Sequence, residues 1–162
     1  MSAIAIFQSL LLLTLANGSP VIARKVFGDR FAFPLDAGAL LFDGRPVFGA
    51  SKTVRGIIAA VVMTATGAAV LGLKFELGAL VAIVAMAGDL FSSFLKRRLN
   101  LPPSSQAMGL DQVPESLFPV LACRDMLSLS YAEIFVIVWI FFVGELVISR
   151  ILYMLGVRDR PY

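Results

Sequence analysis

The segment "GDLFSSFLKRR" places one carboxylate, two hydroxyls and three cations directly after an apolar run. Four of these side chains fall on one stripe of a helix: Asp89, Ser93, Lys96 and Arg97. A carboxylate inside a membrane boundary costs about 3 kcal/mol unless it is paired or bound to metal, so the stripe predicts a functional site that faces protein or water. The alternative is that Asp89 pairs with an arginine of a neighbouring helix and that the cations only anchor the helix end.

A second segment, "FGASKTVRG" at residues 48–56, has the composition of a phosphate-binding turn. Gly49 allows close backbone approach, Lys52 and Arg55 lie three residues apart, and Thr53 stands at the expected first turn of a helix. Helix-terminal N–H groups, a hydroxyl and two cations could together hold a polyphosphate. The glycine spacing of a Walker loop is absent. The alternative is a basic cap that touches anionic lipid headgroups.

A third segment, "GLDQVPESLF", carries Asp111 and Glu115 four residues apart at the expected start of a helix. Asp89 and Asp111 could share a hard divalent cation whose other ligands are water and phosphate oxygens. Mg²⁺ suits that arrangement. The alternative is that these acids are ordinary residues of a helix N-terminus, where negative charge is favourable.

Two further groups of polar residues are less specific. Asp36 lies seven residues before the "DGR" turn formed by Asp43 and Arg45, and a solvated loop explains all three equally well. Glu145 lies in the middle of the last apolar run with Ser149 one turn later. We expect these two to form a hydrogen-bonded pair inside the bundle, with a proton or substrate role as the alternative.

The composition limits both the class of protein and its chemistry. Of 162 residues, 59% are hydrophobic and 15% charged, and the mean hydropathy of +0.88 predicts an integral membrane protein. The chain has no histidine and one cysteine, Cys123, which excludes a histidine proton shuttle and a thiolate metal cluster within one chain. Any chemistry must therefore use carboxylates, cations and hydroxyls.

Hydropathy predicts an all-α integral membrane protein, a compact bundle of about five transmembrane helices forming one domain over residues 1–162. The expected helices span residues 3–24, 54–73, 77–97, 114–129 and 131–156. We expect the first helix to be kinked or broken near Pro20. We expect the fourth to be interrupted by Pro119 and by Arg124 and Asp125, and so to be a broken, tilted or half-buried helix rather than a clean span.

The distribution of basic residues predicts the orientation of this bundle. With five spans, all of the fourteen cations except Lys74 and Arg124 fall on one side of the membrane. The excess of Lys and Arg in cytoplasmic loops then places the N-terminus outside and the C-terminus in the cytoplasm. The three polar segments described above converge on the cytoplasmic face.

Taken together, these motifs resemble a known family. "GDLFSSFLKRR" followed by "GLDQ" resembles the C-terminal signature of membrane CTP:lipid-phosphate cytidylyltransferases, and "SKTVRG" resembles their upstream element. The short length and the block "LDAG....DGRPVFGASKTVRG" are more similar to the CDP-archaeol synthase family, whose compact five-helix members resemble the C-terminal half of bacterial CDP-diacylglycerol synthases. The resemblance covers residues 17–125.

The resemblance implies a magnesium-dependent reaction in which a lipid phosphomonoester attacks the α-phosphorus of CTP and releases pyrophosphate. The implied lipid is 2,3-di-O-geranylgeranylglycerol 1-phosphate or a related phosphatidic acid. By motif position, Asp89 and Asp111 would hold metal. The groups that would neutralise the triphosphate and the lipid phosphate are Lys52, Thr53, Arg55, Lys96 and Arg97.

The same resemblance implies that Asp36, Asp43 and Arg45 lie in the loop that closes over the nucleotide. The family commonly has a second acidic residue where this chain has Pro114, and the adjacent Glu115 could substitute as a metal ligand. The implied setting is the cell membrane with the active site on its cytoplasmic face. The implied partners are CTP, the lipid phosphate and membrane lipids, without nucleic acid, and a bundle of this size can form a homodimer.

Two other functions are weighed against this one. A small transporter or channel would use Asp89 and Glu145 as ion sites, but it leaves the basic cluster on one face unexplained. A CDP-alcohol phosphotransferase would need a long motif of spaced aspartates after "DG..AR", and the chain does not supply it after Asp43.

Overall fold

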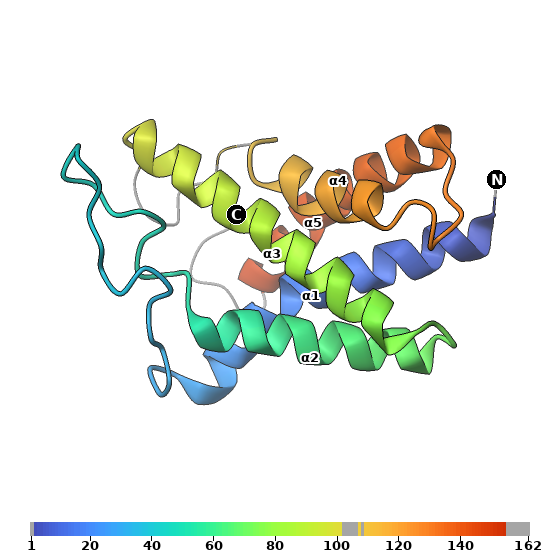
Figure 1. The fold of residues 1–162 in the computed structure, drawn as a ribbon, viewed down its shortest axis with the longest axis horizontal. Helices are drawn as coiled ribbons and strands as arrows, with labels where there is room; N and C mark the ends of the chain where they lie inside the picture. Colours follow the sequence, from blue (N-terminus) through green and yellow to red (C-terminus); the bar gives the residue numbers. More distant parts are fainter. Residues whose placement is uncertain (1, 102–106, 108, 155–162) are drawn as a thin grey trace.

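The computed structural model describes residues 2–101, 107 and 109–154. Within these residues the chain forms five α-helices joined by turns and loops (Figure 1). They are α1 (Ala3–Phe27), α2 (Val54–Val70), α3 (Phe75–Arg98), α4 (Gln112–Ala122) and α5 (Tyr131–Met154). Each of the five helices expected from hydropathy is present, and the all-helical class is confirmed for this part of the chain. The expected end of the last helix at residue 156 lies outside the described residues.

Of the two outcomes expected at Pro20, a break in α1 does not occur. The helix continues to Phe27 and ends where Gly28, at φ 56°, donates its N–H to the Arg24 carbonyl. Proline removes one backbone donor, but a long apolar helix tolerates that loss when neighbouring helices hold it in place. A Cβ added to Gly56 of α2 would lie 3.3 Å from the Pro20 Cβ, which shows how closely α2 packs on this turn.

The fourth helix is shorter than its apolar sequence predicts. It passes through Pro119, where an interruption was expected, and ends at Ala122, just before the expected interruption at Arg124 and Asp125. Residues 123–128 form turns instead of further helix. The Arg124 Nε donates to the Leu129 carbonyl at 3.1 Å, and the Leu129 N–H donates back to the Arg124 carbonyl at 2.9 Å. These bonds satisfy the backbone of the turn and direct the chain into α5.

α1, α2 and α4 pack against α3, which lies between α2 and α4 in Figure 1, and α5 packs against α4 and α1. Small residues permit the contact with α2: a Cβ added to Gly78 would lie 2.5 Å from the Thr64 carbonyl oxygen. The larger core cluster joins α1, α3 and α5 through residues such as Leu12, Val81 and Ile137.

Three helices are long and apolar enough to cross a membrane: α1, α3 and α5 through Ile151. α2 is apolar but has 17 residues, and α4 has 11. Large apolar side chains such as Phe135 (72% exposed) and Trp139 (60% exposed) lie on the outside of the bundle, where water would be an unfavourable solvent. The chain is therefore a membrane protein, and five full spans with the N-terminus outside remain a prediction.

Candidate functional site

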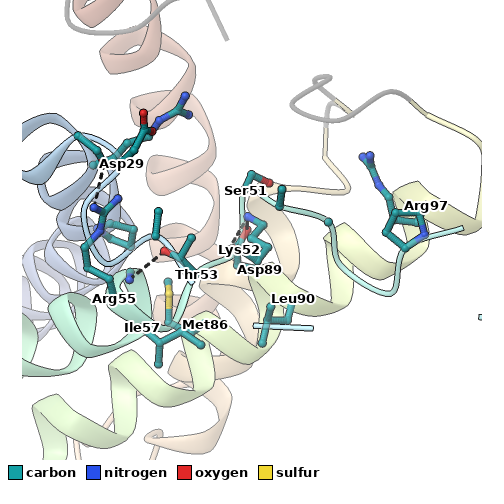
Figure 2. A pocket seen from close by; sticks show the side chains of 18 residues that line it. Asp29, Ser51, Lys52, Thr53, Arg55, Ile57, Met86, Asp89, Leu90 and Arg97 are labelled. Carbon is teal, nitrogen blue, oxygen red and sulfur yellow. Dashed lines mark hydrogen bonds and ion pairs between the residues drawn. The ribbon is translucent and has the colours of Figure 1, made fainter. Parts of the chain in front are cut away.

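A cavity of about 550 Å³ lies where the end of α1, the loop before α2, the first turn of α2 and the C-terminal half of α3 meet (Figure 2). Its wall contains six charged residues. They are Arg24, Asp29, Lys52, Arg55, Asp89 and Arg97. Two segments that the sequence singled out, residues 48–56 and 88–98, thus contribute to one cavity.

The central contact of the cavity is an ion pair between Lys52 and Asp89. The Lys52 Nζ lies 2.6 Å from each Asp89 carboxylate oxygen, and the two side chains are 23% and 20% exposed. Burial opposes the charge of Lys52, but the Asp89 carboxylate outweighs it and holds the pKa of the lysine above its usual value. Asp89 therefore pairs across the fold, with a lysine from the loop before α2 rather than with an arginine of a neighbouring helix.

The loop before α2 is irregular but extensively hydrogen-bonded, and this fixes Lys52. The Leu35 N–H donates to the Lys52 carbonyl at 2.8 Å. Asp36 accepts the N–H groups of Phe48 and Gly49, both at 2.9 Å. Gly49 sits at φ 94°, a conformation that favours glycine. Asp36 thus orders the loop from outside the cavity.

These hydrogen bonds also govern the ionisation of Asp36. Partial burial opposes the charge of its carboxylate, but the N–H groups of Gly49, Phe48 and Gly38 stabilise the charge and lower the pKa of Asp36 below its ordinary value. The carboxylate is consequently a charged anchor of the loop at neutral pH.

The start of α2 has the composition and geometry expected for an anion-binding end. Thr53 caps the helix, with its Oγ1 accepting the Gly56 N–H at 3.2 Å. The Arg55 Nη1 donates to the Gly28 carbonyl at 2.9 Å and also to the Arg30 carbonyl, which holds the end of α1 beside the cavity. Thr53 and Arg55 both line the cavity, so helix N–H groups, a hydroxyl and a guanidinium meet there.

A second ion pair joins α3 to the beginning of α4, outside the cavity wall. Lys96 Nζ lies 2.6 Å from Asp111 Oδ1, and Asp111 Oδ2 accepts the Ala107 N–H at 3.1 Å. Asp111 immediately precedes α4, yet its side chain makes no capping bond to that helix. Asp111 thus lies at the N-terminus of α4, as expected, but its carboxylate binds Lys96 and the Ala107 N–H instead of capping the helix.

Glu115 lies behind Asp89 on the first turn of α4. It is 7% exposed and shares a side-chain hydrogen bond with Asp89. This approach depends on Gly88, because a Cβ added there would lie 2.4 Å from the Pro114 carbonyl oxygen. Ser92 fixes the same junction by donating its hydroxyl to the Leu110 carbonyl at 2.6 Å.

Asp43 and Arg45 hold the loop against the end of α3 and do not line the cavity. Asp43 Oδ1 lies 2.6 Å from Arg98 Nη1, and Arg45 Nη1 donates to the Arg98 carbonyl at 2.9 Å. From the resemblance, Asp36, Asp43 and Arg45 were all expected in the loop that closes over the nucleotide. In the structure all three side chains are engaged in holding the loop.

The carboxylates suit a hard cation only in part. Within the described ranges no cluster of three or more acidic or cysteine side chains is close enough to enclose a metal ion. Asp89 lines the cavity and shares a side-chain hydrogen bond with Glu115 behind it, and Mg²⁺ usually needs one or two carboxylates because water and substrate phosphate supply its other ligands. Asp111 is held by Lys96, so Asp89 with Glu115 fits the ion better than the expected Asp89 with Asp111.

Arg24 and Asp29 line the cavity but were not singled out as site residues from the sequence. In the sequence, Arg24 contributes only to the prediction of membrane orientation, because a basic residue next to a membrane helix is explained by topology alone. One feature of the sequence could have identified Arg24 as a site residue: it lies one turn before the end of a helix that leads into the phosphate-binding loop. Glu145 of α5 lies close enough to Glu115 to interact with it electrostatically, and its expected bond with Ser149 remains a prediction.

The fold and the cavity define a helical membrane protein with a cation-rich pocket at the ends of its helices. A family model described as "CarS-like: CDP-archaeol synthase" matches residues 67–162. The CDP-archaeol synthase of Sulfurisphaera tokodaii is 31% identical over 154 residues, which cover 91% of this chain and 89% of that protein. The chain therefore belongs to the CDP-archaeol synthase family.

Other relatives match a shorter stretch. The CDP-archaeol synthase of Pyrococcus furiosus is 40% identical over 107 residues, and that of Thermococcus onnurineus is 44% identical over 109 residues. The matched stretch is 60% of this chain in both cases, and it spans 60% and 61% of those proteins. A solved structure, described as an intramembrane enzyme for archaeal membrane lipids biosynthesis, superimposes with a TM-score of 0.71 at 25% identity, covering 86% of this chain and 91% of that one.

Proposed function

We propose that this protein transfers the cytidylyl group of CTP to a lipid phosphomonoester, giving a CDP-lipid and pyrophosphate. The observation that carries the proposal is the Lys52–Asp89 pair in the wall of a cation-rich cavity at the end of an apolar bundle. Such a cavity can neutralise a triphosphate, and the carboxylate beside it can hold the metal ion that accompanies one. The family membership supports the same reaction.

The chain's own residues would act by binding and orienting charge. Lys52 and Arg55, with the N–H groups at the start of α2, face a position where the triphosphate can lie, and Thr53 adds a hydroxyl. The nucleophile is an oxygen of the lipid phosphate, which attacks the α-phosphorus while the α–β bridging oxygen leaves with pyrophosphate. A phosphate oxygen is already ionised at neutral pH, so this step needs no histidine base.

Mg²⁺ is the proposed cofactor. Asp89 and Glu115 would hold it, and the bound ion would neutralise charge that develops on the triphosphate. Asp111 and Lys96 would keep the start of α4 in register with α3, so that Glu115 stays beside Asp89. Arg97, which is 7% exposed, lines the cavity near its outer end and completes the positive wall.

The proposed lipid is an ether-linked isoprenoid phosphate such as 2,3-di-O-geranylgeranylglycerol 1-phosphate, with a phosphatidic acid as the alternative. The names of the relatives favour the first. We place the single domain of residues 1–162 in the cell membrane with its cavity on the cytoplasmic face, since the basic residues concentrate there. A homodimer is compatible with the exposed apolar helices.

The test is turnover by purified protein in detergent micelles with labelled CTP, magnesium and a panel of ether-linked and ester-linked lipid phosphates. We expect pyrophosphate and a labelled CDP-lipid. Asp89→Asn should abolish turnover while circular dichroism and the melting temperature show a folded protein, because the amide cannot replace a metal-bound carboxylate. Activity that survives in both Asp89→Asn and Glu115→Gln would remove these residues from the metal role. Proton-coupled flux in liposomes without product would instead support the transporter.

A further inference from the structure

The cations that line the cavity differ in whether their side chains already have partners. Lys52 is bound to Asp89, Arg55 to two backbone carbonyls, and Arg97 is almost fully buried and has a partner of its own. In the part of the chain that the structure describes, Arg24 is the one cavity-lining cation whose side chain makes no ion pair or hydrogen bond. Its five donors are therefore available to an anion that enters the cavity.

Arg24 lines the cavity from the last turn of α1, a helix that is long and apolar enough to cross a membrane. Pro20 lies one turn earlier on the same stripe of α1, and it lines the cavity together with Ile57 of α2. On the outer side of the same turns, Ile22 is 63% exposed and Val26 is 68% exposed, as expected for residues that face lipid. Arg24 thus lies between apolar residues that line the cavity and exposed apolar residues of the same helix.

The two phosphate-bearing substrates of the proposed reaction reach the cavity from different sides. CTP comes from water, and the start of α2 with Lys52 and Thr53 offers it an anion-binding end. The lipid phosphate stays tethered to the bilayer, so its headgroup must enter beside lipid-facing helices. The position of Arg24 meets that requirement, and a guanidinium binds a phosphate with two parallel hydrogen bonds.

We propose that Arg24 binds the phosphomonoester of the lipid substrate and holds it for attack on the nucleotide. The inference rests on the proposed cytidylyl transfer and adds to it the subsite of the second substrate. In this arrangement the lipid lies with its phosphate at Arg24 and the first part of its apolar body over Pro20 and Ile57.

The test compares Arg24→Gln with Lys25→Gln. Lys25 is the adjacent exposed cation and does not line the cavity, so the pair removes the same charge from neighbouring positions of α1. For Arg24→Gln we expect the KM for lipid phosphate in mixed micelles to rise about tenfold or more, which corresponds to loss of a charge-assisted hydrogen bond. The KM for CTP should stay within about twofold, Lys25→Gln should behave as wild type, and Arg24→Lys should recover part of the loss.

A binding measurement makes the inference independent of turnover. Lipid phosphate added to nucleotide-free protein should raise the melting temperature of wild type and of Lys25→Gln, and much less that of Arg24→Gln. A raised KM for CTP with an unchanged KM for lipid would assign Arg24 to the triphosphate and overturn the proposal. Equal effects of Arg24→Gln and Lys25→Gln would show that general surface charge attracts the lipid, and would overturn the proposal. A wild type that binds lipid phosphate through Arg24 but forms no CDP-lipid would refute the proposed function instead.

Discussion

Two ion pairs hold the loop before α2 to α3, and they differ in what surrounds them. Lys52–Asp89 and Arg98–Asp43 have the same nitrogen–oxygen distance of 2.6 Å. Both Lys52 and Asp89 line the cavity, and the lysine ammonium is hydrogen-bonded to both oxygens of the carboxylate (Figure 2). Arg98 also donates to the Pro46 carbonyl at 2.6 Å and lies 5.2 Å from the centre of the Phe94 ring.

Because of this difference, Lys52 and Asp89 can exchange each other for a bound ligand, whereas Arg98 and Asp43 stay paired. A lysine is a compact charge on a flexible stem, so an entering phosphate can attract Lys52 and leave Asp89 available to a metal ion. The guanidinium of Arg98 is held by several acceptors at once, and the loss of one would leave buried carbonyls unsatisfied. We therefore interpret Lys52–Asp89 as part of the site and Arg98–Asp43 as a structural clamp.

The largest expected contrast comes from removing the cation of each pair. Lys52→Met should lower kcat/KM for CTP about a hundredfold or more, since it removes a charge that stabilises the triphosphate as the bond breaks. Arg98→Met should leave kcat/KM within about fivefold and lower the melting temperature, because it releases the loop. Steady-state kinetics and thermal melts of both variants in the same detergent measure the contrast. Equal losses of activity would show that the two pairs are not functionally distinct.

A second contrast tests the helix contact behind Asp89. Gly88→Ala and Gly78→Ala each place a methyl group 2.4–2.5 Å from a backbone oxygen of a neighbouring helix, α4 in the first case and α2 in the second. Both should destabilise the protein by about 1–3 kcal/mol through overpacking. Only Gly88→Ala should also move Glu115 away from Asp89 and lower kcat, by about tenfold or more.

The readout for this contrast is kcat of the folded protein, with the melting temperature measured in parallel. The KM for CTP should change little in either variant, because the cavity wall contains no residue of α4. In a Glu115→Gln background, Gly88→Ala should add little further loss of kcat, since both changes act on the same contact. Independent, additive losses would mean that Gly88 does not act through Glu115.

The smallest effect concerns the loop anchor Asp36. Its pKa is lowered in the folded protein, so its contribution to stability is complete above the unfolded pKa of about 3.9 and is lost as the pH falls through the lower folded value. Asp36→Asn should therefore reduce the melting temperature at neutral pH by a small amount. The difference from wild type should shrink below about pH 4. A difference that is constant across this pH range would show that the charge of Asp36 does not stabilise the loop.

The sequence predicted the helices well because each apolar run has a length and composition that only a membrane or core helix satisfies. It also predicted the cap of α2 at Thr53 and the polar environment of Asp89, since both follow from local chemistry. It left open whether α1 would break at Pro20, and it expected an interruption at Pro119, through which α4 continues. Both outcomes depend on packing by neighbouring helices, which the residues beside each proline do not encode.

By itself, the sequence therefore determined that this is a helical membrane protein with acidic and basic residues at its helix ends, because hydropathy and helical spacing act over neighbouring residues. Only the tertiary structure decided which acid meets which cation: Asp89 with Lys52, Asp111 with Lys96, and Asp43 with Arg98. It likewise left the Arg24 side chain open to the cavity. Charges of one sign are interchangeable in a sequence, and they become distinct only when helix packing fixes the distances between them.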